Sequence, residues 1–340
     1  MQATPLYPLR FEPIYQYRPW GGRRLAKLLS RSLPGDGPIG EAWVLSDRDD
    51  HSSVVADGPL KGRTIRQLST EYPQQLLGEL AGHVSRFPLL LKFLDVSQRL
   101  SVQVHPSDAY RELIPAGDTG KTEAWVVLEE GSEARIFAGL KAGVRADTLR
   151  RAIAEATVMD LLAGFAPKPG DVVFIPAGTV HSMSDAVVFE VQQNSDVTFR
   201  VYDWDRLDPS TGVRRPLQVD QAMACIDFAR GAVGSSIPLV QEAGPVLREE
   251  LVVCDQFGLT RISGALPFTV GTMAMPRVLV CLAGSGRLEH AHGRCAFGKG
   301  DVLLLPAVLG ECCCRPDGSV RVLEISLPEV AGRHETAHRP

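Results

Sequence analysis

The stretch Gly170-Asp171-Val172-Val173-Phe174-Ile175-Pro176-Ala177-Gly178-Thr179-Val180-His181 decides the fold. Gly-Asp marks a turn, the next four residues are the β-branched and aromatic types of a buried strand, and Pro176 ends that strand. A tight turn at Gly178 then leads to His181. The stretch therefore predicts a strand, a turn and a histidine at fixed spacing.

The same turn and strand return near the C-terminus. Gly-Asp, four strand residues and Pro-Ala, first seen in 170–177, recur in 300–307 at a constant offset of 130 residues. Two equivalent copies predict two similar barrels in tandem, although turn signals can also resemble each other by chance. Only the first copy continues to a histidine, because the second continues as Val308-Leu309-Gly310.

Short apolar runs separated by Pro and Gly are typical of an all-β barrel or sandwich. Strands are expected at 87–96, 100–105, 123–128, 171–175, 186–192 and 278–282. Helical patterns interrupt them at 64–79, with Thr64 as the N-cap, and at 147–163. Residues 228–248 resemble a linker, and the tail from Leu327 is expected to fray. The chain is therefore predicted to be mainly β, with helical insertions.

The composition narrows the class of protein. Of the 340 residues, 44% are hydrophobic and 22% charged, and the net charge is −4 without any run of Lys and Arg. This suits a compact soluble protein with two domains and disfavours nucleic acid as a partner. Neither a signal-peptide pattern nor about 18 consecutive apolar residues occurs, so we expect a cytoplasmic protein without a membrane partner.

Two groups of residues look like metal sites without being convincing ones. The seven cysteines all lie beyond residue 224 and form no C-x-x-C pair, which argues against a disulfide framework. Cys312-Cys313-Cys314 could offer thiolates, but neighbouring strand residues point to opposite faces, so ordinary strand residues are expected there. His290-Ala291-His292 precedes Gly293, and a solvated hairpin turn is expected.

Two further segments place polar side chains on one strand face. In 100–105 the alternation puts these residues together: Ser101, Gln103 and His105. Such a face either meets water or lines a site, and the residues alone do not decide. The same period in 120–125 groups Lys121, Glu123 and Trp125, where Glu123 is either a surface carboxylate or a further ligand.

The spacing Gly170-x5-Pro176-x-Gly178-x2-His181 matches the second motif of the cupins, small β-barrels that hold a metal ion inside. The usual first cupin motif is replaced by Gln103-x-His105, with Glu123 eighteen residues after His105. That departure resembles the type I mannose-6-phosphate isomerases (phosphomannose isomerases). Further blocks resemble this family in the same order: Trp20-Gly21-Gly22, 40–43, 87–92, 103–106, 120–123, 176–181 and 193–196. Residues 199–206 resemble its short bacterial form.

The resemblance implies a fold and an activity. It implies two tandem cupin-like jelly-roll barrels: a catalytic metal-binding domain at 1–230 with helical insertions, and a degenerate domain at 245–328 without metal ligands. The implied reaction is the interconversion of D-mannose 6-phosphate and D-fructose 6-phosphate, an aldose-ketose isomerisation of mannose metabolism through a metal-assisted enediol. One Zn²⁺ per chain is implied, other divalent metals being compatible with the same ligands, and a monomer or weak homodimer is expected.

The resemblance also assigns residues. The implied metal ligands are Gln103, His105, Glu123 and His181. The implied catalytic residues are Arg200, placed near the developing oxyanion, Glu190 as the base, and Lys121. The implied substrate-binding residues are Trp20, Glu41, Lys92, Ser101, Asp196 and Arg206, of which Asp196 is also the rival base and Lys92, Lys121 and Arg206 are the cations available for the phosphate.

Two other functions are alternatives for a chain of this kind. Metal-dependent cupin oxygenases share the fold, but Gln103 in place of a histidine and the basic residues around it argue against one. A non-catalytic sugar-phosphate sensor would keep the pocket without turnover, but every residue expected for catalysis is present.

Overall fold

The structure is a computed structural model that describes residues 5–208 and 211–328. The chain divides into two compact units, each built from separate stretches. The site unit comprises 14–43 and 89–236, and the C-terminal unit comprises 1–13, 44–88 and 237–340. Residues 44–88 thus group with the C-terminal strands, whereas the sequence was expected to divide into contiguous domains at 1–230 and 245–328.

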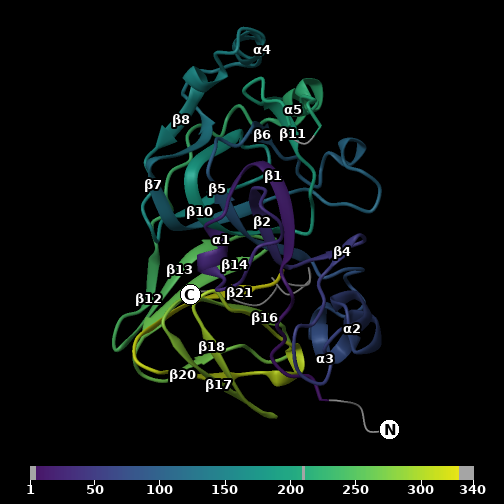
Figure 1. Cartoon of the computed structure of the whole chain (residues 1–340), viewed down its shortest axis with the longest axis vertical. Helices are drawn as coiled ribbons and strands as arrows, with labels where there is room; N and C mark the ends of the chain where they lie inside the picture. Colours follow the sequence, from purple (N-terminus) through teal and green to yellow (C-terminus); the bar gives the residue numbers. More distant parts are fainter. Residues whose placement is uncertain (1–4, 209–210, 329–340) are drawn as a thin grey trace, which may run out of the picture. The chain divides into compact units, whose positions relative to one another are not determined.

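The site unit is built on a nine-stranded antiparallel sheet in which β10 is the central strand, between β5 and β7 (Figure 1). Its strands are β1 Ile14–Gly22, β2 Ile39–Leu45, β5 Leu89–Val96, β6 Val102–Val104, β7 Glu123–Leu140, β8 Leu162–Phe165, β9 Val172–Ile175, β10 His181–Gln193 and β11 Phe199–Tyr202. The apolar faces of β5, β7, β9 and β10 enclose a core that includes Leu94, Trp125, Val173 and Val188.

Short helices connect these strands: α1 Leu25–Leu28, η2 Arg111–Leu113, α4 Ala146–Ala154, η3 Val158–Leu161 and α5 Val219–Cys225. The helix predicted at 147–163 is wrong in its second half. Ala156 has a φ of 56°, a conformation that an α-helix does not contain, and Leu162 already begins β8.

The C-terminal unit contains a six-stranded sheet, a four-stranded sheet and a small hairpin. Its strands are β3 Asp47–Arg48, β4 His51–Ser52, β12 Leu239–Glu242, β13 Val246–Val253, β14 Gly258–Gly264, β15 Phe268–Val270, β16 Arg277–Ala283, β17 Ser285–His290, β18 Gly293–Gly298, β19 Val302–Leu305, β20 Cys312–Pro316 and β21 Val320–Ser326. The linker predicted at 228–248 is therefore wrong beyond Leu239, because β12 and the start of β13 occupy it. All four β12 residues are exposed, so the strand shows no alternation in sequence.

The helices of this unit are α2 Ile65–Glu71, α3 Pro73–Leu77, η1 Gly78–Leu80 and η4 Ala307–Leu309. Thr64 is the N-cap as predicted, since its side chain accepts from the Gln67 N–H at 3.1 Å and the Gln67 side chain accepts from the Thr64 N–H at 2.9 Å. The single helix predicted at 64–79 is broken at Tyr72, because the residue before Pro73 avoids the helical conformation.

The features that resembled metal sites in this unit are structural. Cys312 and Cys314 point into the apolar core and Cys313 is half-buried, as strand alternation predicts. Burial raises the pKa of the Cys314 thiol to about 12. His290 ends β17 and Gly293 begins β18, with two residues between them, which confirms the hairpin turn.

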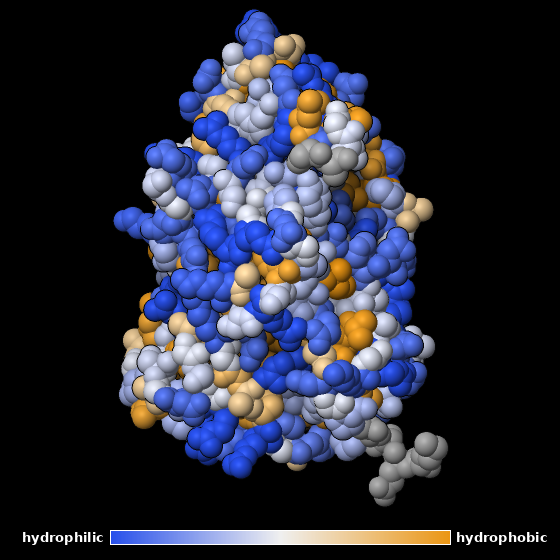
Figure 2. Space-filling view, viewed as in Figure 1, coloured by the Kyte–Doolittle hydropathy of each residue, from blue (hydrophilic) through white to orange (hydrophobic). Residues whose placement is uncertain are grey.

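The mainly β fold expected from the sequence is confirmed. No described helix is long and apolar enough to cross a membrane. On the face drawn in Figure 2, hydrophilic residues predominate and hydrophobic ones form small separate groups. The tail beyond residue 328, which was expected to fray, lies outside the described residues.

Candidate active site

Strand register brings the predicted site residues together in two rows. Across β5, β10 and β7, Glu190 pairs with Lys92 on one side and with Trp125 on the other. Across β11, β6 and β10, Gln103 lies between Arg200 and His181. Directly paired residues have Cβ atoms about 4.5–5.5 Å apart, so each row presents three neighbouring side chains.

A kink in β10 allows His181 and Glu190 to lie on the same side of the sheet. They are nine residues apart, and an odd separation puts two residues on opposite faces of a regular strand. Asp185, however, has a φ of 50°, and the inward-facing series changes there from Met183 to Ala186 and Val188. The register against β7 also shifts at this point. Asp185 therefore acts as a bulge that turns both functional side chains inward.

Three buried side chains form a group that could hold a metal ion, the one such group among the described residues: His105, Glu123 and His181. Nε2 of His105 lies 3.5 Å from one Glu123 carboxylate oxygen, and Nε2 of His181 lies 3.3 Å from the other. Tetrahedral ligands bonded at about 2.0–2.1 Å stand about 3.4 Å apart, so the spacing fits a bound ion. Glu123 Oε1 is buried and accepts no hydrogen bond within the described part of the chain.

The backbone sets the tautomer of both histidines. Nδ1 of His105 donates to the Val197 carbonyl at 2.7 Å, and Nδ1 of His181 donates to the Thr179 carbonyl at 2.9 Å. Burial lowers the pKa of His181 to about 4 and holds that of His105 well below its usual range. Both rings are therefore neutral at pH 7, and each has an Nε2 lone pair available to a metal ion. The nearest donors to these lone pairs are Lys121 Nζ for His105 and Gln103 Nε2 for His181, each at 3.2 Å.

Gln103 completes the set after one rotation. Its Nε2 lies 3.2 Å from His181 Nε2, and its Oε1 accepts from the Ser101 hydroxyl at 3.0 Å. Turning the amide by 180° exchanges these atoms and points the oxygen at the metal group. The Ser101 hydroxyl serves either arrangement, because it both donates and accepts.

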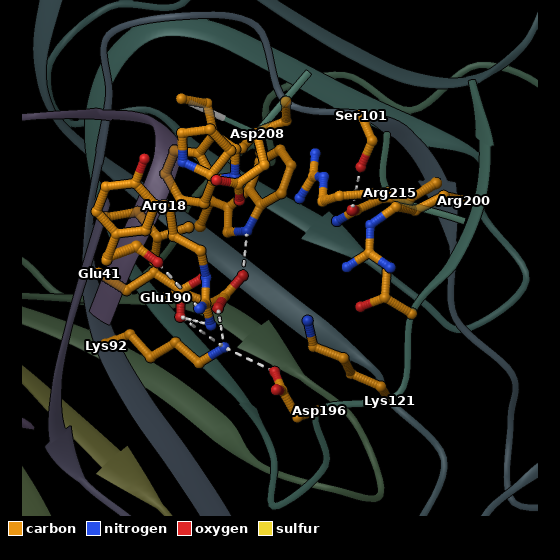
Figure 3. A pocket seen from close by; sticks show the side chains of 18 residues that line it. Arg18, Glu41, Lys92, Ser101, Lys121, Glu190, Asp196, Arg200, Asp208 and Arg215 are labelled. Atoms are coloured by element: carbon orange, nitrogen blue, oxygen red, sulfur yellow. Dashed lines mark hydrogen bonds and ion pairs between the residues drawn. The ribbon is translucent and has the colours of Figure 1, made fainter. Parts of the chain in front are cut away.

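Cations and carboxylates lie close to one another in the cavity drawn in Figure 3. Lys92 Nζ lies 3.4 Å from Glu190, 3.7 Å from Glu41 and 3.8 Å from Asp196. Glu41 also accepts from Arg18 Nε at 2.8 Å and from Trp43 Nε1 at 2.6 Å. Burial alone would raise the pKa of Glu41, but Lys92 and Arg18 hold it well below its usual range. Glu41 thus remains ionised.

Lys121 and Glu190 are the buried ionisable groups beside the metal set. Lys121 Nζ lies 2.9 Å from Glu123 and 3.2 Å from His105 Nε2. Although burial opposes its charge, the Glu123 and Glu190 carboxylates raise the pKa of Lys121. Burial raises the pKa of Glu190, against the opposing charge of Lys121, and Trp125 Nε1 donates to it at 2.8 Å.

The cavity gathers most of the predicted residues. Of those assigned from the sequence, these line it: Trp20, Glu41, Lys92, Ser101, Gln103, Lys121, Glu190, Asp196 and Arg200. The polar strand face of 101–105 therefore lines a site and is not solvated. Arg206 is not among the lining residues, because it lies 3.4 Å from Asp203 and donates to the Arg99 carbonyl at 2.5 Å.

Trp125, which alternation grouped with Lys121 and Glu123, also lines the cavity. Sequence reasoning missed several other lining residues: Tyr17, Arg18, Thr198, Asp208 and Arg215. Period-2 spacing offered a signal for Arg18, which is two residues from Trp20. Arg215 follows a loop, where no periodicity could have placed it.

Comparisons with known proteins agree with this geometry. The family defined as phosphomannose isomerase type I, catalytic domain, matches residues 9–122. Mannose-6-phosphate isomerase ManA of Bacillus subtilis is 35% identical over 316 residues, covering 89% of this chain and 94% of that protein. The chain belongs to the type I phosphomannose isomerases.

Other relatives extend the family match over nearly the whole chain. The mannose-6-phosphate isomerase of Streptococcus mutans is 34% identical over 304 residues, which is 88% of this chain and 92% of that protein. The crystal structure of the mannose 6-phosphate isomerase from Bacillus subtilis superposes with a TM-score of 0.84 at 30% identity, covering 94% of this chain and 99% of that one. Membership in this phosphomannose isomerase family therefore includes the C-terminal unit.

Proposed function

We propose that this chain interconverts D-mannose 6-phosphate and D-fructose 6-phosphate. The observation that carries the proposal is the inward-facing group of two neutral histidines and a buried carboxylate, beside a cavity rich in cations. Its relatives are named for the same reaction and match it over most of their length. The cytoplasmic location stays a prediction from the sequence.

The metal ligands in this proposal are Gln103, His105, Glu123 and His181. Two imidazoles, one carboxylate and one amide oxygen, without thiolate, suit zinc. A bound divalent ion would supply positive charge near the sugar oxygens, where charge develops during proton transfer.

Glu190 is the proposed base. Isomerisation removes the C2 proton, passes through an enediol and returns a proton to C1, so the base must exchange protons near neutral pH. Glu190 is buried and has a raised pKa, which favours such exchange. Glu41 is held ionised by Lys92 and Arg18, and the side chain of Asp196 is 42% exposed, so both are weaker candidates.

Lys121 and Arg200 are proposed to stabilise the developing charge on O1 and O2. Lys121 is protonated and directed at the metal group, and Arg200 is paired across β11 and β6 with Gln103. Preorganised cations of this kind are worth roughly 10²–10³ in turnover. Trp20, Glu41, Lys92, Ser101 and Asp196 would form the remaining walls of the sugar site.

A coupled assay with mannose 6-phosphate tests the function. Formation of fructose 6-phosphate is followed in the purified protein, after chelator treatment, and after zinc is added back. We expect turnover that the chelator abolishes and zinc restores. Glu190→Gln should abolish turnover while keeping a full equivalent of metal. A wild-type protein with its metal bound but without turnover would favour the sensor or the oxygenase instead.

A further inference from the structure

The cavity contains two arginines that its own carboxylates do not neutralise. Three of the five cations that line it lie close to acids: Arg18 at 2.8 Å from Glu41, Lys92 at 3.4 Å from Glu190, and Lys121 at 2.9 Å from Glu123. The other two are Arg200 and Arg215. Arg200 Nε is buried and finds no acceptor within the described residues, so this side of the cavity can accommodate an anion.

Arg215 is held in a fixed orientation. Its Nε donates to one oxygen of Asp203 at 2.8 Å and its Nη2 to the other at 2.6 Å, and its side chain is only 19% exposed. A guanidinium has five N–H donors, so this two-point contact leaves Nη1 able to donate elsewhere. Because Asp203 also faces Arg206 at 3.4 Å, one carboxylate serves two guanidinium groups and net positive charge remains.

Arg200 and Arg215 lie next to each other. In Figure 3 the side chains of Arg200 and Arg215 are neighbours on the side of the cavity near Ser101, away from Lys92 and Glu41. Burial and the Arg215 charge together lower the pKa of Arg200. Two guanidinium groups this close are stabilised by an anion that both can contact.

Their positions differ with respect to the metal group. Arg200 is one strand from Gln103 and two strands from His181, which places it toward the reacting end of a substrate. Arg215 lies outside the strands, lines the cavity next to Arg200, and is in none of the register pairs with Gln103 or His181. A hexose 6-phosphate carries its phosphate four carbons from C2, and Arg215 is suited to that distant end.

We propose that Arg215, oriented by Asp203, binds the phosphate of the substrate, and that Arg206 does not. This inference rests on the proposed function. Arg206 is directed to the Arg99 carbonyl outside the lining. Lys92 lies 3.4–3.8 Å from three carboxylates, and Lys121 lies beside the metal group, 2.9 Å from Glu123. Arg215 lines the cavity and shares its one carboxylate, Asp203, with Arg206. Arg215 is therefore a specificity-determining residue for the phosphorylated sugar.

Calorimetric titration of the metal-loaded protein with inorganic phosphate tests this assignment. Arg215→Ala should weaken phosphate binding about tenfold to a hundredfold, the range for one charge-assisted hydrogen-bonding partner. Arg215→Lys should lose less phosphate affinity than Arg215→Ala, because lysine keeps the positive charge although it lacks the planar pair of N–H donors. With mannose 6-phosphate, Arg215→Ala should raise KM by a similar factor and change kcat little, whereas Arg200→Ala should lower kcat by orders of magnitude with metal unchanged.

Two neighbouring arginines serve as matched controls. Arg214 is exposed and paired with Asp205 at 2.7 Å, so Arg214→Ala should leave both measurements unchanged. Arg206→Ala should also bind phosphate within about twofold of wild type. Unchanged phosphate affinity in Arg215→Ala and Arg215→Lys, with unaltered unfolding temperature, would overturn the proposal, as would an equal loss in Arg206→Ala. Phosphate binding does not depend on turnover, so an inactive wild type that loses phosphate on Arg215→Ala would contradict only the proposed function.

Discussion

The two units contain the same turn, but the residues that follow it differ in their chemistry. In 168–171 and in 298–301, the aspartate carboxylate accepts from the N–H of the first residue at 2.9 Å, and the aspartate N–H donates to that residue's carbonyl at 3.0 Å. The third residue of each turn is a glycine, with φ of 93° and 90°. Each turn then opens a four-residue strand that ends before a proline. The backbone is thus the same where the chemistry differs.

The strand register shows what replaces the metal group in the C-terminal unit. In the site unit His181, the first residue of β10, pairs with Gln103 of β6. In the C-terminal unit Cys312, the first residue of β20, pairs with Val270 of β15. Glu123 pairs with Ile175, the last residue of β9. At the corresponding place in the C-terminal unit, Arg277 pairs with Leu305, the last residue of β19. Cys312 and Val270 belong to an apolar cluster. Apolar side chains therefore occupy these positions, and the degenerate cupin domain at 245–328 stays a prediction from the sequence.

The first prediction compares a metal-ligand position in the site unit with an apolar position in the C-terminal unit. His181→Ala should lower metal affinity at least a hundredfold and abolish turnover, because a ligand whose tautomer is fixed by Thr179 is removed. Cys312→Ala, at the first residue of β20, should leave metal content and turnover unchanged and lower only the unfolding temperature. Metal analysis and the coupled assay measure both. A His181→Ala protein that keeps a full equivalent of ion would refute the ligand set.

The second prediction concerns how each unit bends its central strand. In the C-terminal unit the corresponding strand is divided into two, β20 and β21. In the site unit β10 is continuous, and Asp185 within it has a left-handed conformation. Asp185→Gly and Asp185→Val both remove the ion pair with Arg24, but valine also strains the backbone. We expect Asp185→Val to be less stable than Asp185→Gly by about 1–2 kcal/mol, with weaker metal binding. Equal unfolding free energies in denaturant would show that the bulge is not required.

The sequence predicted those parts of the fold and site that depend on local patterns. Alternation correctly grouped Ser101, Gln103 and His105, and the spacing up to His181 identified the metal-bearing strand. Alternation could not place His181 and Glu190 on one face, because the bulge at Asp185 has no signal in residue type. Only the family resemblance included Glu190.

Charged pairs across the cavity were the part that escaped prediction. Arg206 and Arg215 are both polar residues outside strand periodicity, and which of them faces the cavity depends on Asp203, which contacts both. Likewise, Glu41 is fixed by Arg18, a residue 23 positions away that its own neighbours do not reveal. Which charged side chains pair with each other depends on tertiary packing, and a single sequence gives no direct information on it.

The smallest expected effect on stability concerns Glu324, a carboxylate of the C-terminal unit whose place in the sheet corresponds to that of Glu190. Glu324 opposes Leu279 and Thr260, as Glu190 opposes Trp125 and Lys92. In the C-terminal unit no lysine or indole faces it in register, and it accepts from the Gly271 N–H at 2.5 Å. Burial raises the pKa of Glu324 above 4.5, so the folded state holds its proton more tightly than the unfolded chain does.

The pH dependence follows from that sign. The contribution of Glu324 to stability is complete below its unfolded pKa and is lost as pH rises through the raised value in the folded state. Glu324→Gln, which stays neutral and still accepts from Gly271, should raise the unfolding temperature by roughly 2–4 °C at pH 8, or about 1 kcal/mol, and leave it unchanged at pH 4. As a control, Glu311→Gln, at an exposed position, should leave the unfolding temperature unchanged at both pH values. A lower unfolding temperature at pH 8 would instead mean that the charge of Arg277 makes the ionised carboxylate stabilising, as Lys92 and Arg18 do for Glu41.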